Sequence, residues 1–251
     1  MLPHDDVGSG AAVVLLHAGI ADRGMWAEQL EPLAAAAFRV VAPDLPGFGE
    51  APPPREQDAP WADLLGTMDA LSIQRAALVG NSFGADVALR AAMVAPDRVQ
   101  ALVLCSARAP GVGPYAELEA VWEAEEAALD RGDIDAAVEA IVDAWTLPGA
   151  SGELRARVAA MQRRAFELQS ADSAAVEAPD PLEQRPDALA RLDVPALATA
   201  GEHDKRDFLE SAELLARTLP RGRHAVIEGA GHLAPLEAPE AFRELVVGFL
   251  R

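Results

Sequence analysis

Short apolar runs alternate with helix-like stretches along most of this chain, and the alternation restricts the fold more than any other feature of the sequence. The rhythm extends from Ala12 to Arg108 and resumes from Val194 to Arg251. Because each run is apolar at nearly every position, it is typical of a strand buried on both faces. The pattern predicts an α/β fold: a doubly wound, mostly parallel sheet of about six strands, with helices on both faces. The six runs are AAVVLLH ending at His17, RVVAP after Phe38, AALVG ending at Gly80, ALVLCS ending at Ser106, PALATAG ending at Gly201 and HAVIEG starting at His224.

The alternation stops in the middle of the chain, where three helical patterns follow one another with no strand between them. Gly132 and Asp133 supply a helix stop and an N-cap at the first junction, and Ser151 supplies the N-cap at the second. An all-helical insertion is therefore expected within the α/β sheet. It divides the chain into a core, residues 1–108 and 188–251, and an inserted segment, residues 109–187.

The chain is acidic, with 40 acidic residues against 21 basic ones among 251 and a formal net charge of −19. Such a surface repels nucleic acid and anionic lipid, so neither is an expected partner. The single cysteine, Cys105, excludes an internal disulfide, and its apolar setting predicts a buried, unreactive thiol. The first ten residues lack the basic region of a signal peptide, and no apolar run approaches the roughly 18 residues that span a bilayer. We therefore expect a cytoplasmic protein.

The third apolar run leads into Gly80-Asn81-Ser82-Phe83-Gly84, which a helix-like stretch follows at once. Glycines two residues before and after a serine permit a cramped strand-to-helix turn that exposes the serine oxygen above the sheet. A helix N-terminus also presents backbone N–H groups to a developing negative charge. Ser82 is therefore a candidate nucleophile.

The chain also resembles the α/β-hydrolase superfamily, from about Gly8 to the carboxyl terminus, because four further motifs of that family accompany the serine motif in the expected order. The resemblance is greatest to small cofactor-free serine hydrolases, the group that includes 3-oxoadipate enol-lactonase and related carboxylesterases. It implies that the helical insertion is a lid and that no cofactor is needed. The motifs are His17-Ala18-Gly19-Ile20, the oxyanion loop; Asp44-Leu45-Pro46-Gly47-Phe48-Gly49, the turn after the second strand; Gly201-Glu202-His203-Asp204, the turn with the acid; and Gly229-Ala230-Gly231-His232, the loop with the histidine.

Physical reasoning supports the same acid and base. A serine hydroxyl needs a base near neutral pH, usually a histidine that a carboxylate holds in one tautomer. Of the five histidines, only His232 lies in a Gly-rich turn at the carboxyl end of a strand. Asp204 also ends a strand, and the 28 residues from it to His232 accommodate one helix and one return strand. We interpret Asp207 as the N-cap of that helix, His17 as a brace for its own loop and His4 as part of a tail.

The order Ser82, Asp204, His232 is that of a catalytic triad on this fold. In the mechanism that we hypothesise, His232 takes the Ser82 proton as Ser82 attacks a carbonyl, and water later hydrolyses the acyl-enzyme. The backbone N–H groups of Gly19 and Phe83 are expected to hold the oxyanion. No metal is expected, because the histidines lack a metal-site spacing.

Three features depart from the family pattern. Ala18 replaces the usual glycine after the loop histidine, and Glu50 stands where a serine commonly follows the second motif. We interpret Glu50 only as a surface charge. About ten residues precede the first apolar run, so the N-terminal antiparallel hairpin of most relatives is expected to be reduced or absent.

The predicted reaction is hydrolysis of a carboxylic ester or an (enol-)lactone, so the expected partner is a small molecule. Trp122, Trp145, Met161 and Leu233 are candidates for lining its pocket, although the first three serve equally well to pack the inserted helices together. A carbon–carbon bond hydrolase of ring-cleavage products is an alternative that shares the Gly-Asn-Ser-Phe-Gly turn, but such relatives usually carry tryptophan where Leu233 stands. A non-catalytic ligand-binding protein on the same fold is the third hypothesis, which the intact triad disfavours.

Much of the negative charge lies on the first two inserted helices. Between Tyr115 and Thr146 there are ten acidic residues against Arg131 alone, a local charge of −9. The usual interpretation is a solvated outer face opposite an apolar stripe. The functional alternative is that these carboxylates repel anionic substrates.

Overall fold

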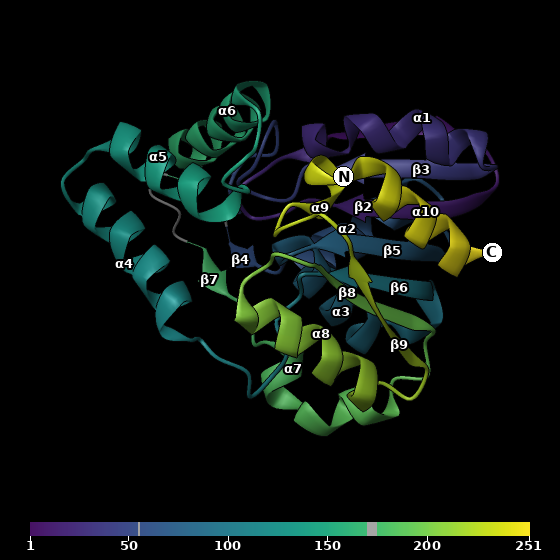
Figure 1. The fold of residues 1–251 in the computed structure, drawn as a ribbon. Helices are drawn as coiled ribbons and strands as arrows, with labels where there is room; N and C mark the ends of the chain where they lie inside the picture. The colour runs from purple at the N-terminus through teal and green to yellow at the C-terminus, as the bar shows by residue number, and fades with distance from the viewer. Residues whose placement is uncertain (55, 170–174) are drawn as a thin grey trace.

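A sheet of seven strands lies at the centre of the molecule, within the part of the chain that the computed structural model describes, residues 1–54, 56–169 and 175–251 (Figure 1). Its strands are β1 (His4–Gly8), β2 (Ala11–Leu16), β3 (Phe38–Pro43), β5 (Ala76–Asn81), β6 (Val99–Cys105), β8 (Ala196–Gly201) and β9 (Gly222–Ile227). They follow the order β1-β3-β2-β5-β6-β8-β9 across the sheet. Neighbouring strands are parallel, except that β1 runs antiparallel to β3.

The six strands predicted from apolar runs are all present, as β2, β3, β5, β6, β8 and β9. The central strands β5 and β8 are buried at every residue, which explains why their sequences show no alternation of apolar and polar positions. The last strand, β9, lies at the edge of the sheet and is half open to solvent. A doubly wound, mostly parallel sheet is therefore confirmed.

The seventh strand, β1, corrects the prediction of six strands and of a tail around His4. Residues His4 to Gly8 pair with β3 from Pro43 to Arg39. An edge strand has one neighbour and a solvated side, so it carries no continuous apolar run. Its acidic side chains are accommodated there, and Asp6 forms an ion pair with Arg39 at 2.7 Å. The antiparallel element expected to be reduced or absent is thus reduced to one strand.

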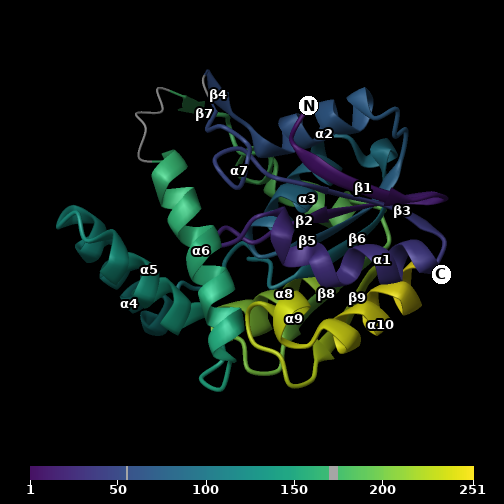
Figure 2. The ribbon, with the colours of Figure 1, turned by 90° about the horizontal axis from the view of Figure 1, so that it is seen from above.

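Helices cover both faces of the sheet. Figure 2 shows α1 and α10 on one face and α2 and α3 on the other. Phe242 and Val246, one turn apart, are the buried residues of α10. The helices of the core are α1 (Ala27–Ala35), α2 (Pro60–Ala70), α3 (Phe83–Val94), α8 (Arg206–Thr218), α9 (Ala234–Glu237), α10 (Pro239–Leu250) and the 3-10 helices η1 (Arg23–Trp26) and η2 (Pro96–Arg98). Two short helices stand where the inserted segment returns to the core: α7 (Pro181–Gln184) and the 3-10 helix η3 (Pro186–Arg191).

Three consecutive helices follow β6, as the sequence predicted: α4 (Ala116–Asp130), α5 (Ile134–Trp145) and α6 (Gly152–Gln169). Asp133 caps α5 through the N–H of Ala136, and Ser151 accepts the N–H of Leu154 at the start of α6. The three helices lie together beyond one end of the sheet (Figures 1 and 2). The segment is not wholly helical, because β7 (Val176–Glu177) pairs in parallel with β4 (Gln57–Asp58). Two-residue strands are too short to leave a periodic signal in the sequence.

The acidic run on α4 and α5 faces solvent. Nine of its ten carboxylates are exposed, and the tenth, Glu125, is half-buried with its pKa raised by desolvation. Three of the exposed ones form ion pairs, Glu117 with Lys205, Asp135 with Arg163 and Asp143 with Arg155. The acidic residues therefore form a largely solvated outer face. No helix in the described ranges has both the length and the apolar character that crossing a membrane requires.

Candidate active site

Ser82 occupies the turn between β5 and α3. Its backbone has φ 51° and ψ −120°, a conformation that a non-glycine residue adopts only under constraint. The Ser82 N–H donates to the carbonyl oxygen of Cys105 at 2.8 Å, which fixes the turn to the end of β6. Cys105 is fully buried, as predicted, and desolvation raises its pKa to about 12, which disfavours the reactive thiolate.

The two glycines of the serine motif are required by close backbone approach. A Cβ atom on Gly80 would lie 2.4 Å from the backbone nitrogen of Ala85. A Cβ atom on Gly84 would lie 2.1 Å from the carbonyl oxygen of Leu16, at the end of β2. Gly84, the second residue of α3, therefore packs directly on the sheet, and the cramped strand-to-helix turn inferred from the sequence is present.

His232 and Asp204 form the buried pair that the sequence predicted. His232 Nδ1 lies 2.9 Å from Asp204 Oδ1, and both residues are buried. Because an ionised carboxylate only accepts hydrogen bonds, this contact assigns the imidazole proton to Nδ1 and leaves Nε2 able to accept a proton. The N–H of Lys205 donates to the same carboxylate oxygen at 2.8 Å.

Asn81, the residue before the candidate nucleophile, connects the serine turn to the histidine loop. Its Nδ2 donates to the carbonyl oxygen of His232 at 3.0 Å and, at 3.4 Å, to that of Cys105. Ser106 Oγ donates to the same His232 carbonyl at 3.4 Å. The sequence analysis did not single out Asn81, although its place at the carboxyl end of β5, next to Ser82, is the signal that could have identified it.

Two aromatic side chains contact the His232 ring. The centroids of Trp145, at the end of α5, and of Phe208, in α8, each lie 4.3 Å from the imidazole centroid. Trp145 and Phe208 also contact each other, with centroids 5.9 Å apart. We call His232, Trp145 and Phe208 the aromatic corner. Nothing in the local sequence distinguishes Phe208 from an ordinary core residue of α8.

The predicted oxyanion segments lie against each other. A Cβ atom on Gly19 would lie 3.3 Å from the Cβ of Phe83. His17 braces this loop as expected: its Nδ1 bonds to the carbonyl oxygen of Ala18 at 2.8 Å, and its Nε2 accepts the N–H of Leu45 at 2.9 Å. Complete burial lowers the pKa of His17, which keeps the ring neutral and suited to this pair of bonds.

The four candidate pocket residues have different surroundings. Trp145 is buried against His232, and Leu233, the next residue after His232, is fully buried. Met161 of α6 is buried with its sulfur toward Gly24. Trp122 is 38% exposed on α4, beneath the guanidinium of Arg108. Because a pocket wall needs a side chain turned inward, we do not retain Trp122 as a pocket residue.

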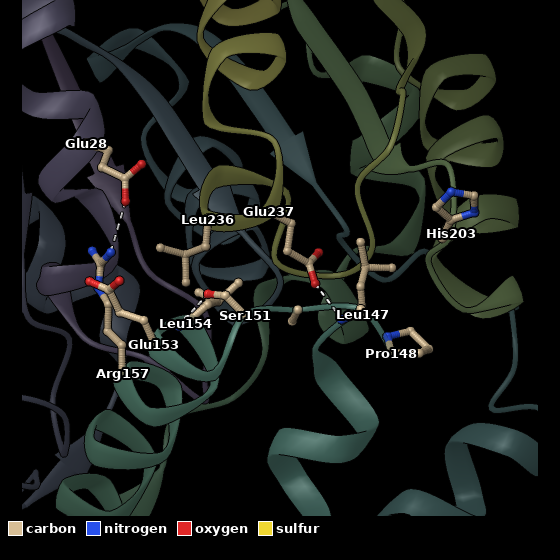
Figure 3. A pocket seen from close by; sticks show the side chains of 12 residues that line it. Glu28, Leu147, Pro148, Ser151, Glu153, Leu154, Arg157, His203, Leu236 and Glu237 are labelled. Carbon is tan, nitrogen blue, oxygen red and sulfur yellow. Dashed lines mark hydrogen bonds and ion pairs between the residues drawn. The ribbon is translucent and has the colours of Figure 1, made fainter.

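A cavity of about 890 Å³ lies beside the histidine loop (Figure 3). In Figure 3 the Glu237 carboxylate points toward the backbone of Leu147, and Arg157 of α6 pairs with Glu28 of α1. A neighbouring cavity of about 400 Å³ is lined by Trp145, Asp204, Lys205 and His232 among others. The two cavities share Leu147, Pro148 and His203 as lining residues, so open space extends along the His232 side of the inserted helices.

Glu50, interpreted from the sequence as a surface charge only, has a partner. Arg23 Nη2 donates to Glu50 Oε2 at 2.9 Å, and Arg23 Nη1 pairs with the carboxylate of Asp44, which is fully buried. Asp44 also accepts the N–H groups of Arg23 and Glu50, each at 2.8 Å. The turn after β3 is therefore closed by one arginine between two carboxylates.

Asp207 does not cap α8, which corrects the sequence interpretation. It lies within the first turn of α8, and its Oδ1 accepts the N–H of Tyr115 at 2.8 Å. Asp207 thus binds the segment that leads into α4, and Lys205 occupies the N-cap position without a side-chain bond to the helix. Among the described residues, no group of three or more His, Cys, Asp or Glu side chains is arranged to hold a metal ion.

The doubly wound sheet and the strand-to-helix turn at the end of β5 define an α/β hydrolase type of fold. The chain belongs to the alpha/beta hydrolase fold family, whose pattern matches residues 11–239.

Relatives with different activities cover almost the whole chain. The 2-hydroxy-6-oxononadienedioate/2-hydroxy-6-oxononatrienedioate hydrolase 2 of Pseudomonas putida is 28% identical over 261 residues, which are 100% of this chain and 91% of that one. A thermophilic esterase from Thermogutta terrifontis has 31% identity and a TM-score of 0.79 over 100% of this chain and 93% of that one. The enol-lactonase from Burkholderia xenovorans LB400 has 25% identity and a TM-score of 0.80 over 99% and 96%. The chain is therefore a hydrolase.

Proposed function

We propose that the chain is a serine hydrolase that cleaves a carboxylic ester or an (enol-)lactone through an acyl-enzyme, with Ser82, His232 and Asp204 as its triad. The observation that carries the proposal is the 2.9 Å contact between His232 Nδ1 and Asp204 Oδ1, on a loop that Asn81 ties to the Ser82 turn. A base that is oriented by a buried carboxylate and attached to a strained serine turn is suited to nucleophilic catalysis.

In the proposed reaction, His232 Nε2 accepts the Ser82 proton while Ser82 Oγ attacks the carbonyl carbon. The oxyanion receives hydrogen bonds from the backbone N–H groups of Gly19 and Phe83. The tetrahedral intermediate expels the alcohol oxygen, which takes the proton from His232. His232 then deprotonates a water molecule, which attacks the acyl group, and the departing Ser82 Oγ takes this proton from His232, so that the free enzyme is restored. Asp204 holds the imidazole in one tautomer throughout. Neither a metal nor a cofactor has a role in this sequence.

The proposal assigns residues 109–187 as a lid and residues 1–108 with 188–251 as the catalytic core. The position of α4, α5 and α6 beyond one end of the sheet supports this division (Figure 1). So does the contact of Trp145, from α5, with His232. Trp145, Met161 and Leu233 are the proposed pocket residues, and a cytoplasmic location is proposed from the sequence.

The second candidate is a carbon–carbon bond hydrolase, which the full-length similarity to the Pseudomonas putida enzyme favours. That enzyme is named for dienedioates, which carry two carboxylates, and carboxylates are usually bound by an unpaired cation. In the described part of this chain, each of the four arginines of α6 already has a protein partner. These pairs are Arg155 with Asp143, Arg157 with Glu28, Arg163 with Asp135 and Arg164 with Glu167. The pairing favours an ester or lactone without an additional carboxylate.

The acidic outer face of α4 and α5 also favours neutral or cationic substrates, because its carboxylates repel anions. Carboxylates at a site entrance lower the local concentration of an anionic ester, and added salt screens this effect. We expect kcat/KM for an anionic ester to rise with ionic strength, whereas kcat/KM for a matched neutral ester stays constant. Equal salt responses of the two esters would mean that the acidity affects only solubility.

The function is tested by covalent labelling and turnover. We expect a fluorophosphonate to label Ser82, and p-nitrophenyl esters of graded chain length to be hydrolysed by the wild type but not by Ser82→Ala. Asp204→Asn is expected to lower kcat by about 10⁴-fold while KM changes little, because the imidazole loses its tautomer. Full activity of Ser82→Ala would exclude the mechanism.

A parallel assay with a ring-cleavage product separates the two hydrolase candidates, since it measures cleavage of a carbon–carbon bond by the same triad. Faster turnover of that substrate than of any ester would favour the second candidate. A protein that binds esters without labelling or turnover would be the non-catalytic ligand-binding protein instead.

A further inference from the structure

Lys205 is the only lysine of the chain, and it follows Asp204 directly. Its side chain is 13% exposed and extends toward the inserted helices. Lys205 Nζ donates to the carbonyl oxygen of Ala144, in the last turn of α5, at 2.9 Å. The same atom lies 3.3 Å from Glu117 Oε1, at the start of α4, and 5.2 Å from the centroid of the Trp145 ring.

An ammonium group with so little exposure is costly unless protein groups replace the water that it loses. The carbonyl of Ala144 lies at the negative end of the α5 helix dipole, Glu117 supplies a full negative charge, and the face of Trp145 attracts a cation. All three groups belong to the insertion, and none belongs to the core. In the position that the structure shows, these three groups of the insertion therefore replace the water that Lys205 Nζ loses on burial.

The side chain of Lys205 contacts the insertion, whereas its backbone N–H contacts the candidate triad. Its N–H donates to Asp204 Oδ1 at 2.8 Å, and this oxygen also bonds His232 Nδ1 at 2.9 Å. One residue thus holds the candidate acid through its backbone and the inserted helices through its side chain. Trp145, the residue after Ala144, lies against the His232 ring, with centroids 4.3 Å apart.

We propose that Lys205 is a positioning residue, which fixes the C-terminal end of α5 so that the Trp145 ring lies against His232 and restricts the imidazole to its catalytic orientation. This inference rests on the proposed function, because it takes His232 to be the base. It adds to the triad a contact from the insertion, that of Trp145 with His232.

Other bonds hold the insertion near this point without a charge on the inserted side. Glu237 accepts the N–H of Leu147 through Oε1 and the N–H of Gly231 through Oε2, each at 2.8 Å. Asp207 accepts the N–H of Tyr115 at 2.8 Å. Removal of the Lys205 charge therefore leaves the insertion attached at Leu147 and Tyr115 and removes only the contacts of Lys205 Nζ with Ala144, Glu117 and Trp145. For this reason we expect variants at position 205 to fold.

The test compares the wild type with Lys205→Met, which keeps the length of the side chain but removes its charge and donors. We expect kcat for a p-nitrophenyl ester to fall about tenfold or more, because the base loses its orientation. KM should stay within about twofold, because substrate binding is unaffected. The exposure of Trp145 is measured as the difference in acrylamide quenching between each protein and its Trp145→Phe counterpart. We expect this quenching to increase about twofold in Lys205→Met.

Arg217→Met is the matched control, because it removes a cation from the last turn of α8 that is 67% exposed and pairs with Glu213 on its own helix. It should leave both kcat and Trp145 quenching unchanged. If Lys205 acts through Trp145, the Lys205→Met/Trp145→Phe double variant is no slower than Trp145→Phe alone, whereas independent effects multiply. Lys205→Gln is the second variant in case Lys205→Met is unstable, and the same outcomes apply to it.

Unchanged kcat and quenching in Lys205→Met, or effects that multiply with those of Trp145→Phe, would overturn the role of Lys205. Failure of the proposed function is a different result, in which the fluorophosphonate does not label Ser82 in the wild type. The quenching measurement does not depend on catalysis, so it tests the position of α5 in either case.

Discussion

The indole ring of Trp145 lies against the imidazole ring of His232, with centroids 4.3 Å apart and planes inclined by 43°. Phe208 completes the aromatic corner at the same centroid distance from His232. Two aromatic neighbours leave the imidazole little room to rotate away from its bond with Asp204. Because Trp145 comes from α5 and Phe208 from α8, the candidate base is enclosed by the insertion and the core together.

We predict that Trp145→Ala lowers kcat/KM for a p-nitrophenyl ester by about tenfold or more, since a freed imidazole spends less time in the productive orientation. The variant should also lose about 3–5 kcal/mol of unfolding free energy, the usual cost of deleting a buried tryptophan. Steady-state kinetics and urea unfolding measure the two effects. Trp122→Ala is the control: Trp122 is 38% exposed, so its removal should leave kcat/KM nearly unchanged. Equal losses of activity in the two variants would contradict the assignment.

Asn81 provides a second prediction, which compares the kcat of two variants, Asn81→Ala and Asn81→Asp. Its Nδ2 donates to the carbonyl oxygens of His232 and Cys105. Asn81→Ala removes both bonds, and we expect kcat to fall about tenfold or more because the histidine loop is no longer tied to the Ser82 turn. Asn81→Asp should be worse than Asn81→Ala, since an ionised carboxylate faces two carbonyl oxygens with no hydrogen to donate. Both variants are assayed for kcat at a temperature at which thermal unfolding shows them to be folded. A lower kcat for Asn81→Ala than for Asn81→Asp would contradict the role of Asn81.

Buried strands and turn motifs were predictable from the sequence because each has a local signature. Strands β5 and β8 are apolar throughout, and the Gly80 and Gly84 positions follow from the close backbone approach that a strand-to-helix turn requires. The pairing of Asp204 with His232 was also predictable, since parallel strands deliver their carboxyl ends to one edge of the sheet. These features depend on short stretches of chain or on strand order alone.

Contacts between distant segments were not predictable. The edge strand β1 carries acids that resemble a tail, and only its pairing with β3 reveals it. Phe208 contacts His232 and Lys205 contacts α5 through three-dimensional packing, for which one sequence has no periodic signal. Asp207 resembled a helix cap because it starts a helical pattern, yet its carboxylate binds the N–H of Tyr115, which is 92 residues away in the sequence.

Arg23 provides a prediction about stability. It pairs with Asp44, whose side chain is fully buried, and with Glu50, whose side chain is 71% exposed. Arg23→Gln leaves a buried carboxylate without its counter-charge, so we expect a loss of about 3 kcal/mol in the free energy of unfolding. Glu50→Gln removes an exposed partner and should cost less than about 1 kcal/mol. Urea unfolding at pH 7 measures both, and a larger loss in Glu50→Gln would contradict this account.

Asp86, in the first turn of α3, provides a prediction about pH. Burial raises its pKa to about 6, although Arg90 nearby and the N–H of Arg108 oppose the shift. Because this pKa is higher in the folded protein than in the unfolded chain, the folded state binds the proton more tightly. The contribution of Asp86 to stability is therefore fully present below about pH 4 and is lost as the pH rises through 6.

Asp86→Asn removes this titration, since an amide has no proton to lose in that range. The unfolding free energy of Asp86→Asn relative to the wild type should therefore rise between pH 4 and pH 7, by about 3 kcal/mol for a shift of about two pKa units. Subtracting the wild-type profile largely cancels the repulsion among the other carboxylates, which both proteins share. Asp97→Asn is the matched control, because it makes the same chemical change at an exposed position just beyond the far end of α3. A difference between Asp86→Asn and the wild type that stays constant from pH 4 to pH 7 would show that the Asp86 carboxylate titrates alike in the folded and unfolded chains.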